Sequence, residues 1–293
     1  MVNTHMAQRS WGFWINRGII HALLIAAALF YLLPLVVMLL TSFKTMGDIR
    51  AGNLISLPAE FVIEPWIKAW SSACTGVKCE GVGSYFFNSV QIVVPAVLIS
   101  TAVGAINGYV LTKWRFRGSE LFFGLLLFGC FIPFQVVLLP MAQTLGWLGL
   151  ANTTAGLVLV HVAYGVAFTT LFFRNFYVNI PSELVKAAQL DGAGFFRIFW
   201  RILLPISGPI IVVTIIWQTT QIWNDFLFGV VYGSGDTQPI TVALNNLVNT
   251  STGIKEYNVH MAAAIIAGLP TLLVYVLAGK YFVRGLTAGS VKG

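Results

Sequence analysis

The chain has 293 residues, of which 57% are hydrophobic and 9% are charged. Soluble domains have roughly 25% charged residues, so this composition and the mean hydropathy of +0.83 exclude an ordinary soluble protein and indicate a membrane protein. The net charge of +7 fits either a nucleic acid or an anionic membrane surface as the partner. The length suits a single transmembrane domain over residues 1–293, with its core at about 84–284, and leaves no room for a soluble ATPase domain as well.

The N-terminal region precedes the first long apolar run. Residues 1–16 are polar and aromatic, and Arg9 and Arg17 give this region a basic flank. The alanines at 26–28 fit the small-residue cleavage site of a signal peptide, but the apolar run continues to Leu40 and is long enough to cross a bilayer. We therefore predict a retained first transmembrane helix.

Six stretches are apolar over about 20 residues, the length that a helix needs to cross a bilayer. They are approximately 19–41, 88–111, 121–141, 152–173, 206–231 and 259–282. The fold class that follows is an all-α polytopic membrane protein with six transmembrane helices.

Five of these stretches contain a proline: Pro34, Pro95, Pro133, Pro209 and Pro270. Proline removes a backbone donor and is tolerated in a spanning helix where neighbouring groups satisfy the freed carbonyl. The prolines therefore favour bent helices around a cavity.

The distribution of Lys and Arg gives the orientation. With the N-terminus in the cytoplasm, the outer segments hold five of the 17 basic residues, namely Lys44, Arg50, Lys68, Lys78 and Lys255. The other twelve fall on the inner side, which is the bias expected for cytoplasmic loops. We predict that both termini are cytoplasmic, and the excess positive charge then requires no nucleic-acid partner.

Two polar segments are predicted on the outer side, a loop at 42–85 and a stretch at 232–258. The first is too short for a domain and is expected to fold back as a short amphipathic segment. Cys74 and Cys79 bracket a tight turn in this loop, so in an oxidising periplasm they form either a disulfide or two free thiols. Cys130 lies in the third span and is expected to fill apolar space.

Motifs for bound cofactors are missing from the sequence. It has no GxxxxGK[ST] phosphate loop and no His or Cys cluster with zinc-site spacing. We expect no cofactor in this chain, and its four scattered histidines are more often packing residues than metal ligands or proton relays.

Asp225 is the one acidic residue inside a predicted span. A carboxylate at membrane depth is costly unless it faces protein or water, so it is either functional or hydrogen-bonded to a neighbouring helix. Trp223 and Asn224 adjoin it, and an aromatic face beside amide and carboxylate groups suits a sugar. Gln218 and Gln221 lie within the same two turns and extend this predicted substrate path. Asn107 and Gln135 are further polar residues at apparent membrane depth, either as lining or as contacts between helices.

The segment 181–209 interrupts the apolar pattern. It contains two short helical runs, 182–190 and 194–204, separated by Asp191 and Gly192. We predict that Ser182 caps the first run, that Asp191 accepts from the free amides of the second, and that Gly192 takes a positive φ between them.

The second run carries Phe195, Ile198, Phe199 and Ile202 on one face. A hairpin with that much apolar surface must bury it. The alternatives are packing on its own helix bundle or docking on a partner.

The order of residues in this hairpin resembles the EAA loop of ABC-transporter permeases. Pro-x-Glu-Leu, Ala-Ala and Asp-Gly-Ala precede an aromatic helix that ends in Leu-Pro, over about 25 positions. The resemblance implies that residues 181–204 form a cytosolic coupling hairpin that docks on an ATPase subunit. The implied docking residues are Glu183, Lys186, Ala187, Ala188, Asp191, Gly192 and Ala193. Lys186 stands where the family often has glutamate, which removes the usual acidic contact.

Two further segments carry the resemblance toward carbohydrate-type members of the family. Residues 223–228, Trp-Asn-Asp-Phe-Leu-Phe, are similar to the same region of carbohydrate permeases. Residues 284–293 resemble the tail of the second permease subunit of maltose-type importers, a tail that reaches the ATPase dimer. Within this group, the chain resembles the glucose/mannose-type members.

The resemblance implies the permease subunit of an ATP-driven sugar importer in the bacterial inner membrane. The implied partners are a second permease, two cytosolic ATPase subunits that hold ATP and Mg²⁺, a periplasmic sugar-binding protein and the lipid bilayer. An ion-coupled secondary transporter is the alternative, although it would be expected to show repeats and more intramembrane ionisable groups. A membrane scaffold without transport would leave the hairpin unexplained.

Overall fold

The computed structural model describes residues 11–53, 55–249 and 255–287, with backbone only for 11–13 and 280–287. The described residues are almost entirely helical, and the β structure among them is a single bridge between Thr75 and Lys78. The chain divides into two compact units. One comprises 1–69 and 253–265, and the other comprises 70–252 and 266–293.

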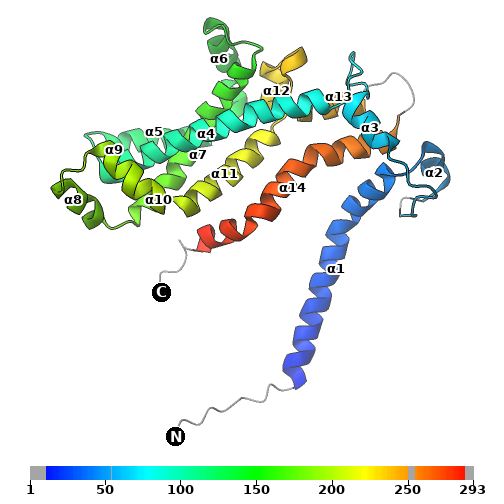
Figure 1. The fold of residues 1–293 in the computed structure, drawn as a ribbon, viewed down its shortest axis with the longest axis horizontal. Helices are drawn as coiled ribbons and strands as arrows, with labels where there is room; N and C mark the ends of the chain where they lie inside the picture. The colour runs from blue at the N-terminus through cyan, green and yellow to red at the C-terminus, as the bar shows by residue number, and fades with distance from the viewer. Residues whose placement is uncertain (1–10, 54, 250–254, 288–293) are drawn as a thin grey trace. The chain divides into compact units, whose positions relative to one another are not determined.

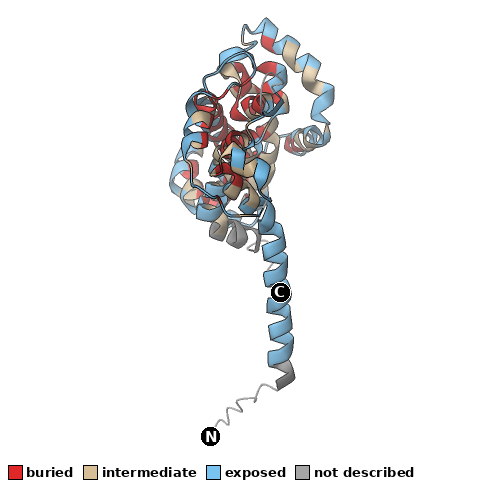
Figure 2. Ribbon diagram, turned by 90° about the vertical axis from the view of Figure 1, so that its right-hand side faces the viewer, coloured by how far each residue is buried: buried red, intermediate tan, exposed pale blue. Residues whose placement is uncertain are grey.

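The first unit contains α1 (Trp11–Ser42), α2 (Met46–Ala51), most of α3 (Glu64–Ser71) and the beginning of α14 (Tyr257–Thr287). The described side chains of α1 from Trp14 to Leu35 are exposed, as the pale blue of this helix in Figure 2 shows. An apolar helix with this much exposed surface is suited to contact with lipid.

Hydrogen bonds tie the segment after α1 to itself and to the beginning of α14. Lys44 is 2% exposed, and its ammonium donates to Ser56 Oγ at 2.9 Å and to the Asn53 carbonyl at 3.4 Å. Asn258 Nδ2 donates to the Lys44 carbonyl at 2.9 Å, and the Lys68 ammonium lies 2.7 Å from the Glu256 carboxylate. The predicted short segment is present as α3.

The second unit is built on α4 (Gly83–Lys113) and α7 (Thr154–Val178), which run side by side in Figure 1. Gly104 and Gly108 permit this approach, because a Cβ at Gly104 would lie 2.3 Å from Thr169 Oγ1 and one at Gly108 would lie 2.7 Å from Phe173 Cβ. Glycines four residues apart are a known device for close packing of membrane helices.

Polar contacts then fix the position of α11 (Gly208–Trp223) against this pair. Thr169 Oγ1 of α7 donates to the Ser100 carbonyl of α4 at 2.8 Å. Gln218 Nε2 of α11 donates to Ser100 Oγ at 2.6 Å, and Asn107 Nδ2 donates to Thr170 Oγ1 at 3.1 Å. Asn107 thus serves as a contact between helices, the second of the two predicted roles.

Four described helices are long and apolar enough to cross a membrane, and two bent pairs raise the number to as many as six. The predicted span over 121–141 is one of these bent pairs, since α5 (Ser119–Phe131) and α6 (Phe134–Trp147) meet at 105°. Pro133 explains the break, since the residue before a proline is driven from the α region, and Ile132 has an extended ψ of 122°.

The predicted span over 206–231 corresponds to α11 followed by a second, short helix. The helix ends at Trp223, and α12 (Leu227–Tyr232) begins after a short break. Pro34, Pro95 and Pro270 lie inside uninterrupted helices instead. Prolines alone therefore do not mark the bends.

The second polar stretch, predicted at 232–258, is more ordered than a polar loop. It contains a 3₁₀ turn (Gly235–Thr237) and α13 (Ile240–Asn249), whose Ile240 amide donates to Ser89 Oγ of α4 at 2.9 Å. Cys74 and Cys79 form a disulfide, and the turn that they close forms a salt bridge from Lys78 to Asp236. The neighbouring carboxylate raises the pKa of the Lys78 ammonium.

We predict that Gly108→Leu lowers the thermal unfolding temperature of the purified chain in detergent by several degrees. The added side chain meets Phe173 and the backbone of α7, and such overpacking costs about 1–3 kcal/mol. Gly124→Leu is the matched control, because a Cβ at this helical glycine meets nothing within 4 Å. Equal unfolding temperatures for the two variants would contradict the close-packing role of Gly108.

Candidate functional site

The hairpin begins with α8 (Ser182–Leu190), whose bounds agree with the predicted run. It continues through α9 (Phe195–Ile198), the π-helical segment η1 (Phe199–Leu203) and α10 (Leu204–Ile206). The turn between them has Gly192 at φ +76°, which confirms the predicted positive φ. The Gly192 amide donates to the Gln189 carbonyl at 3.0 Å and the Ala193 amide to the Ala188 carbonyl at 2.9 Å.

The predicted caps of the two helices are wrong. Pro181 occupies the N-cap of α8 and Gly194 that of α9, and no described side chain caps either helix. Ser182 lies inside α8, and Lys113 Nζ approaches its hydroxyl at 3.5 Å. Asp191 stands four residues before the first residue of α9, too far to occupy the cap position.

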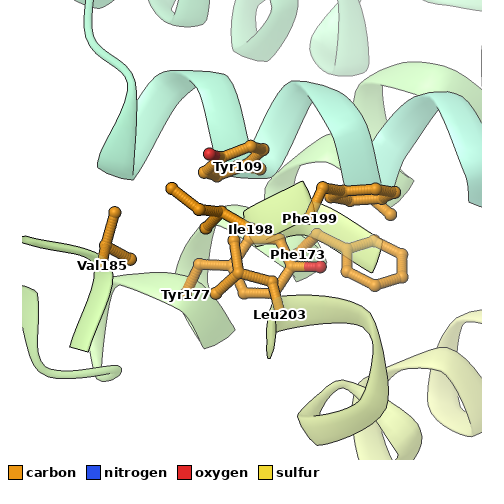
Figure 3. Close-up of a cluster of buried hydrophobic side chains, with 8 residues drawn as sticks. Tyr109, Phe173, Tyr177, Val185, Ile198, Phe199 and Leu203 are labelled. Carbon is orange, nitrogen blue, oxygen red and sulfur yellow. The ribbon is translucent and has the colours of Figure 1, made fainter. Parts of the chain in front are cut away.

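One face of the hairpin is buried on its own helix bundle (Figure 3). Ile198, Phe199 and Leu203 pack with Tyr109 of α4 and with residues of α7. The Tyr109 ring stacks on Phe195 and Phe199 with centroids 4.7 and 5.8 Å apart. The predicted apolar face of the hairpin therefore packs on its own helix bundle, the first of the two alternatives given by the sequence.

Hydrogen bonds reinforce the contact between the hairpin and the helix bundle. Ser207 Oγ donates to the Leu203 carbonyl at 2.5 Å and lies within hydrogen-bond distance, 3.0 Å, of the Tyr177 hydroxyl. Lys113 Nζ at the end of α4 donates to the Ile180 carbonyl at 2.5 Å. The hairpin is thus attached to α4 and α7 and leads directly into α11.

The other face of the hairpin is exposed. Glu183, Lys186, Ala187, Asp191 and Gly192 are exposed, and Ala188 and Ala193 are half-buried against the core cluster. Sequence reasoning missed the large apolar side chains of this face, which are Leu184, Leu190, Phe196 and Trp200, with exposures of 43, 90, 69 and 61%. Val185 is the only described residue of α8 that is buried.

A cavity of about 880 Å³ opens between α5, α6, α7, α11 and the break after α11. Its aromatic lining includes Trp217, whose ring centroid lies 4.7 Å from that of Phe168. Gln221, Asn224 and Asp225 also line it. The lining thus combines a flat apolar surface with uncharged amides and one carboxylate.

The structure separates the predicted substrate-path residues. Gln218, Gln221 and Asn224 all line the cavity, but Gln221 and Asn224 are exposed, whereas Gln218 is 1% exposed and bonded to Ser100. Trp223 is 3% exposed, and its indole N–H donates to the Ala267 carbonyl at 2.8 Å. Trp223 is therefore not among the residues that line the cavity.

Trp217 is the aromatic residue of α11 that reaches the cavity, and sequence reasoning missed it. Helical periodicity was the available signal, because Trp217, Gln221 and Asn224 are spaced i, i+4, i+7 and share a helix face. Trp223 is six residues after Trp217 and so points elsewhere.

Asp225 lies at the break between α11 and α12. Its carboxylate accepts from the amides of Phe228 at 3.4 Å and Gly229 at 3.2 Å, two donors in the first turn of α12. His161 Nε2 lies 3.9 Å from Asp225 Oδ2, and the Asp225 side chain is 17% exposed. Asp225 therefore starts a helix and still borders the cavity.

Comparison with known proteins agrees with the resemblance seen in the sequence. Residues 85–287 match the family described as "Binding-protein-dependent transport system inner membrane component". A probable ABC transporter permease protein of Pyrococcus horikoshii is 39% identical over 280 residues, 95% of this chain and 98% of that protein. The diacetylchitobiose uptake system permease protein of Streptomyces coelicolor is 30% identical over 94% of this chain and 89% of its own length.

A solved structure has the same fold. It is the crystal structure of a bacterial ABC transporter involved in the import of the acidic polysaccharide alginate. The TM-score is 0.80 at 21% identity, with coverage of 94% of this chain and 99% of that chain.

We predict that Asp225→Leu lowers the unfolding temperature of the purified chain, because it removes both acceptors from the first turn of α12. Loss of such a cap costs about 1 kcal/mol. Asp225→Asn is the control, since it keeps one acceptor oxygen and asparagine is itself a good cap. Thermal unfolding in detergent measures both variants. An unfolding temperature of Asp225→Leu equal to that of the unchanged chain would contradict the capping role of Asp225.

Proposed function

The chain belongs to the family of binding-protein-dependent transport system inner membrane components, and from this premise we propose that it is the permease subunit of an ATP-driven importer of a sugar. The family match over 85–287 carries the proposal. Full-length similarity to the diacetylchitobiose uptake permease supports the substrate class.

The cavity supports the same substrate class on chemical grounds. A sugar presents C–H faces that pack on a flat ring, such as the Trp217 and Phe168 pair, and hydroxyls that bond to amides, such as Gln221 and Asn224. The volume of about 880 Å³ admits a monosaccharide or a short oligosaccharide. Asp225 adds one acceptor at the rim.

ATP hydrolysis is proposed to take place on two cytosolic subunits that bind ATP and Mg²⁺. A second permease and a periplasmic sugar-binding protein complete the proposed assembly in the cytoplasmic membrane. Both termini of this chain are then cytoplasmic, on the same side as the hairpin and its neighbouring basic residues Lys113, Arg115 and Arg174. The predicted tail contact with the ATPase at 284–293 falls mostly outside the described residues.

The hairpin is proposed as the docking element for the ATPase, through Glu183, Lys186, Ala187, Ala188, Asp191, Gly192 and Ala193. Its exposed tip at α8 offers a surface, and its base is packed on Tyr109 of α4 and Tyr177 of α7. A displacement of α8 is therefore transmitted to α4, α7 and α11 together, which is the kind of rigid motion that alternates access to a cavity. Because Lys186 replaces the usual glutamate, its ATPase partner should be acidic or neutral.

We predict that Ala187→Asp weakens ATPase binding about tenfold or more, because an unpaired charge buried in an interface costs on the order of 1–3 kcal/mol. Ala187 is exposed, so the fold should survive. Ala151→Asp is the matched control, since Ala151 is also exposed but precedes the other end of α7. Co-purification of tagged permease with its ATPase measures the effect.

A backbone variant tests the same element. Gly192→Val should uncouple ATP hydrolysis from uptake, because valine strongly disfavours φ +76°. Gly194→Val adds the same side chain in equally open space, but at φ −80°, and should uncouple ATP hydrolysis from uptake to a smaller extent. Normal ATPase capture by both Ala187→Asp and Gly192→Val would refute docking at this hairpin.

We also predict that Trp217→Ala raises the sugar concentration for half-maximal uptake about three- to tenfold, whereas Trp217→Phe keeps most of the stacking surface and most of the uptake. The assay is uptake into proteoliposomes that hold the complete assembly and ATP. Uptake that proceeds without ATP and collapses with ionophores would instead favour the ion-coupled alternative.

A further inference from the structure

The helical segment Phe195–Ile206 meets the spanning segment Gly208–Trp223 at 78°. Transmembrane helices are tilted by about 20° on average from the bilayer normal. When α11 crosses the membrane, the preceding segment therefore runs nearly parallel to the membrane surface. It also lies at the end of α11, where that surface is located.

This segment has one buried face and one exposed face. Ile198, Phe199 and Leu203 face the bundle (Figure 3), whereas Phe196 is 69% and Trp200 is 61% exposed. Nothing in the described part of the chain covers these aromatic side chains, so their partner lies beyond that part, in another protein or in the bilayer.

Two arginines accompany the aromatic residues on the exposed side. Arg197 and Arg201 are exposed, and neither forms an ion pair with a carboxylate in the part of the chain that the structure describes. Phe196 and Trp200 are four residues apart, as are Arg197 and Arg201, so the helix presents an aromatic strip beside a basic strip.

This combination is typical of helices that lie in the membrane interface. Tryptophan is enriched at the level of the lipid headgroups, and arginine extends its guanidinium toward lipid phosphates. Helices of this kind bury the apolar strip at the acyl boundary and are strengthened by anionic lipids. The angle to α11 and the exposed side chains thus point to the same partner.

We propose that Phe196 and Trp200 insert into the membrane interface, and that Arg197 and Arg201 bind the phosphates of anionic phospholipids. The assignment to the cytoplasmic leaflet depends on the orientation in the proposed function. The segment from α9 to α10 is then held between the helix bundle and the bilayer, while α8 extends away from this support.

Fluorescence quenching in lipid tests the insertion. An environment-sensitive fluorophore is attached to Trp200→Cys in a Cys130→Ala background, because Cys74 and Cys79 are disulfide-bonded. The full chain is reconstituted in bilayers that contain phospholipid with a nitroxide near the headgroup. Leu190→Cys is the matched control, since Leu190 is 90% exposed but lies at the tip of α8.

We expect strong quenching at position 200, with or without the ATPase, and at least threefold weaker quenching at position 190. Absence of lipid quenching at position 200 would overturn the proposal. Shielding of that position by added ATPase in place of lipid would overturn it as well and would assign the face to protein docking. The measurement needs neither sugar nor ATP hydrolysis, so failure of the proposed transport function would not affect its outcome.

Charge specificity tests the arginines. Nitroxide-labelled phosphatidylglycerol should quench the label at position 200 more than labelled phosphatidylcholine, by about fivefold per arginine at low salt. Arg197→Gln with Arg201→Gln should remove this preference, and Arg115→Gln with Arg117→Gln, which changes two exposed arginines on another loop, should leave it intact. A preference that persists in the Arg197 and Arg201 variant would refute their role.

Discussion

The close approach of α4 and α7 is the constraint on which the rest of the structure depends. Membrane helices gain little from apolar burial against one another, because lipid tails are equally apolar, so packing and polar contacts must hold them together. At Gly108 a single added Cβ would already lie 2.7 Å from Phe173 Cβ. At this separation Thr169 reaches the Ser100 carbonyl, and the Ser100 hydroxyl accepts from Gln218 of α11. Gly165 of α7 leaves room for Gln218, because a Cβ there would lie 2.0 Å from Gln218 Nε2. These contacts together position the third helix and, with it, the wall of the cavity.

The same helix pair supports the hairpin. Tyr109 follows Gly108 directly, and its ring stacks on Phe195 and Phe199, while Phe173 lies opposite Gly108 and belongs to the same buried cluster. The base of the hairpin is therefore a continuation of the α4–α7 contact. Because α10 leads through Ser207 into α11, any movement of this base also moves the helix that carries Trp217 and Gln221. This connection gives the proposed coupling a physical path from the hairpin to the cavity.

The features that sequence reasoning predicted are those set by local chemistry. The bounds of α8 and the positive φ of Gly192 follow from residues within a few positions. Hydropathy predicted where apolar stretches lie, and Pro133 indicated a bend, but neither signal indicates the break between Trp223 and Leu227. Trp217 was missed because the rotation of α11 about its axis is fixed by Gln218 bonding to Ser100, 118 residues away in sequence. The exposed face of α9 was missed for a similar reason, since only the packing on Tyr109 determines which aromatic residues are left outside.

The distribution of buried side chains along the hairpin makes its two parts mechanically different. The segment from α9 to α10 is secured by Ile198, Phe199 and Leu203 on one side and, as proposed, by lipid on the other, whereas α8 is secured by Val185. Segments with few buried contacts open and shift at low free energy. The tip can therefore adapt to the surface of a moving ATPase, while the base, fixed between bundle and bilayer, keeps its angle to α11. A hairpin that was loose throughout would absorb the motion of the ATPase, and one that was rigid throughout could not follow it. Coupling therefore requires both a tip at Ala187 that can move and a base that is fixed on Tyr109.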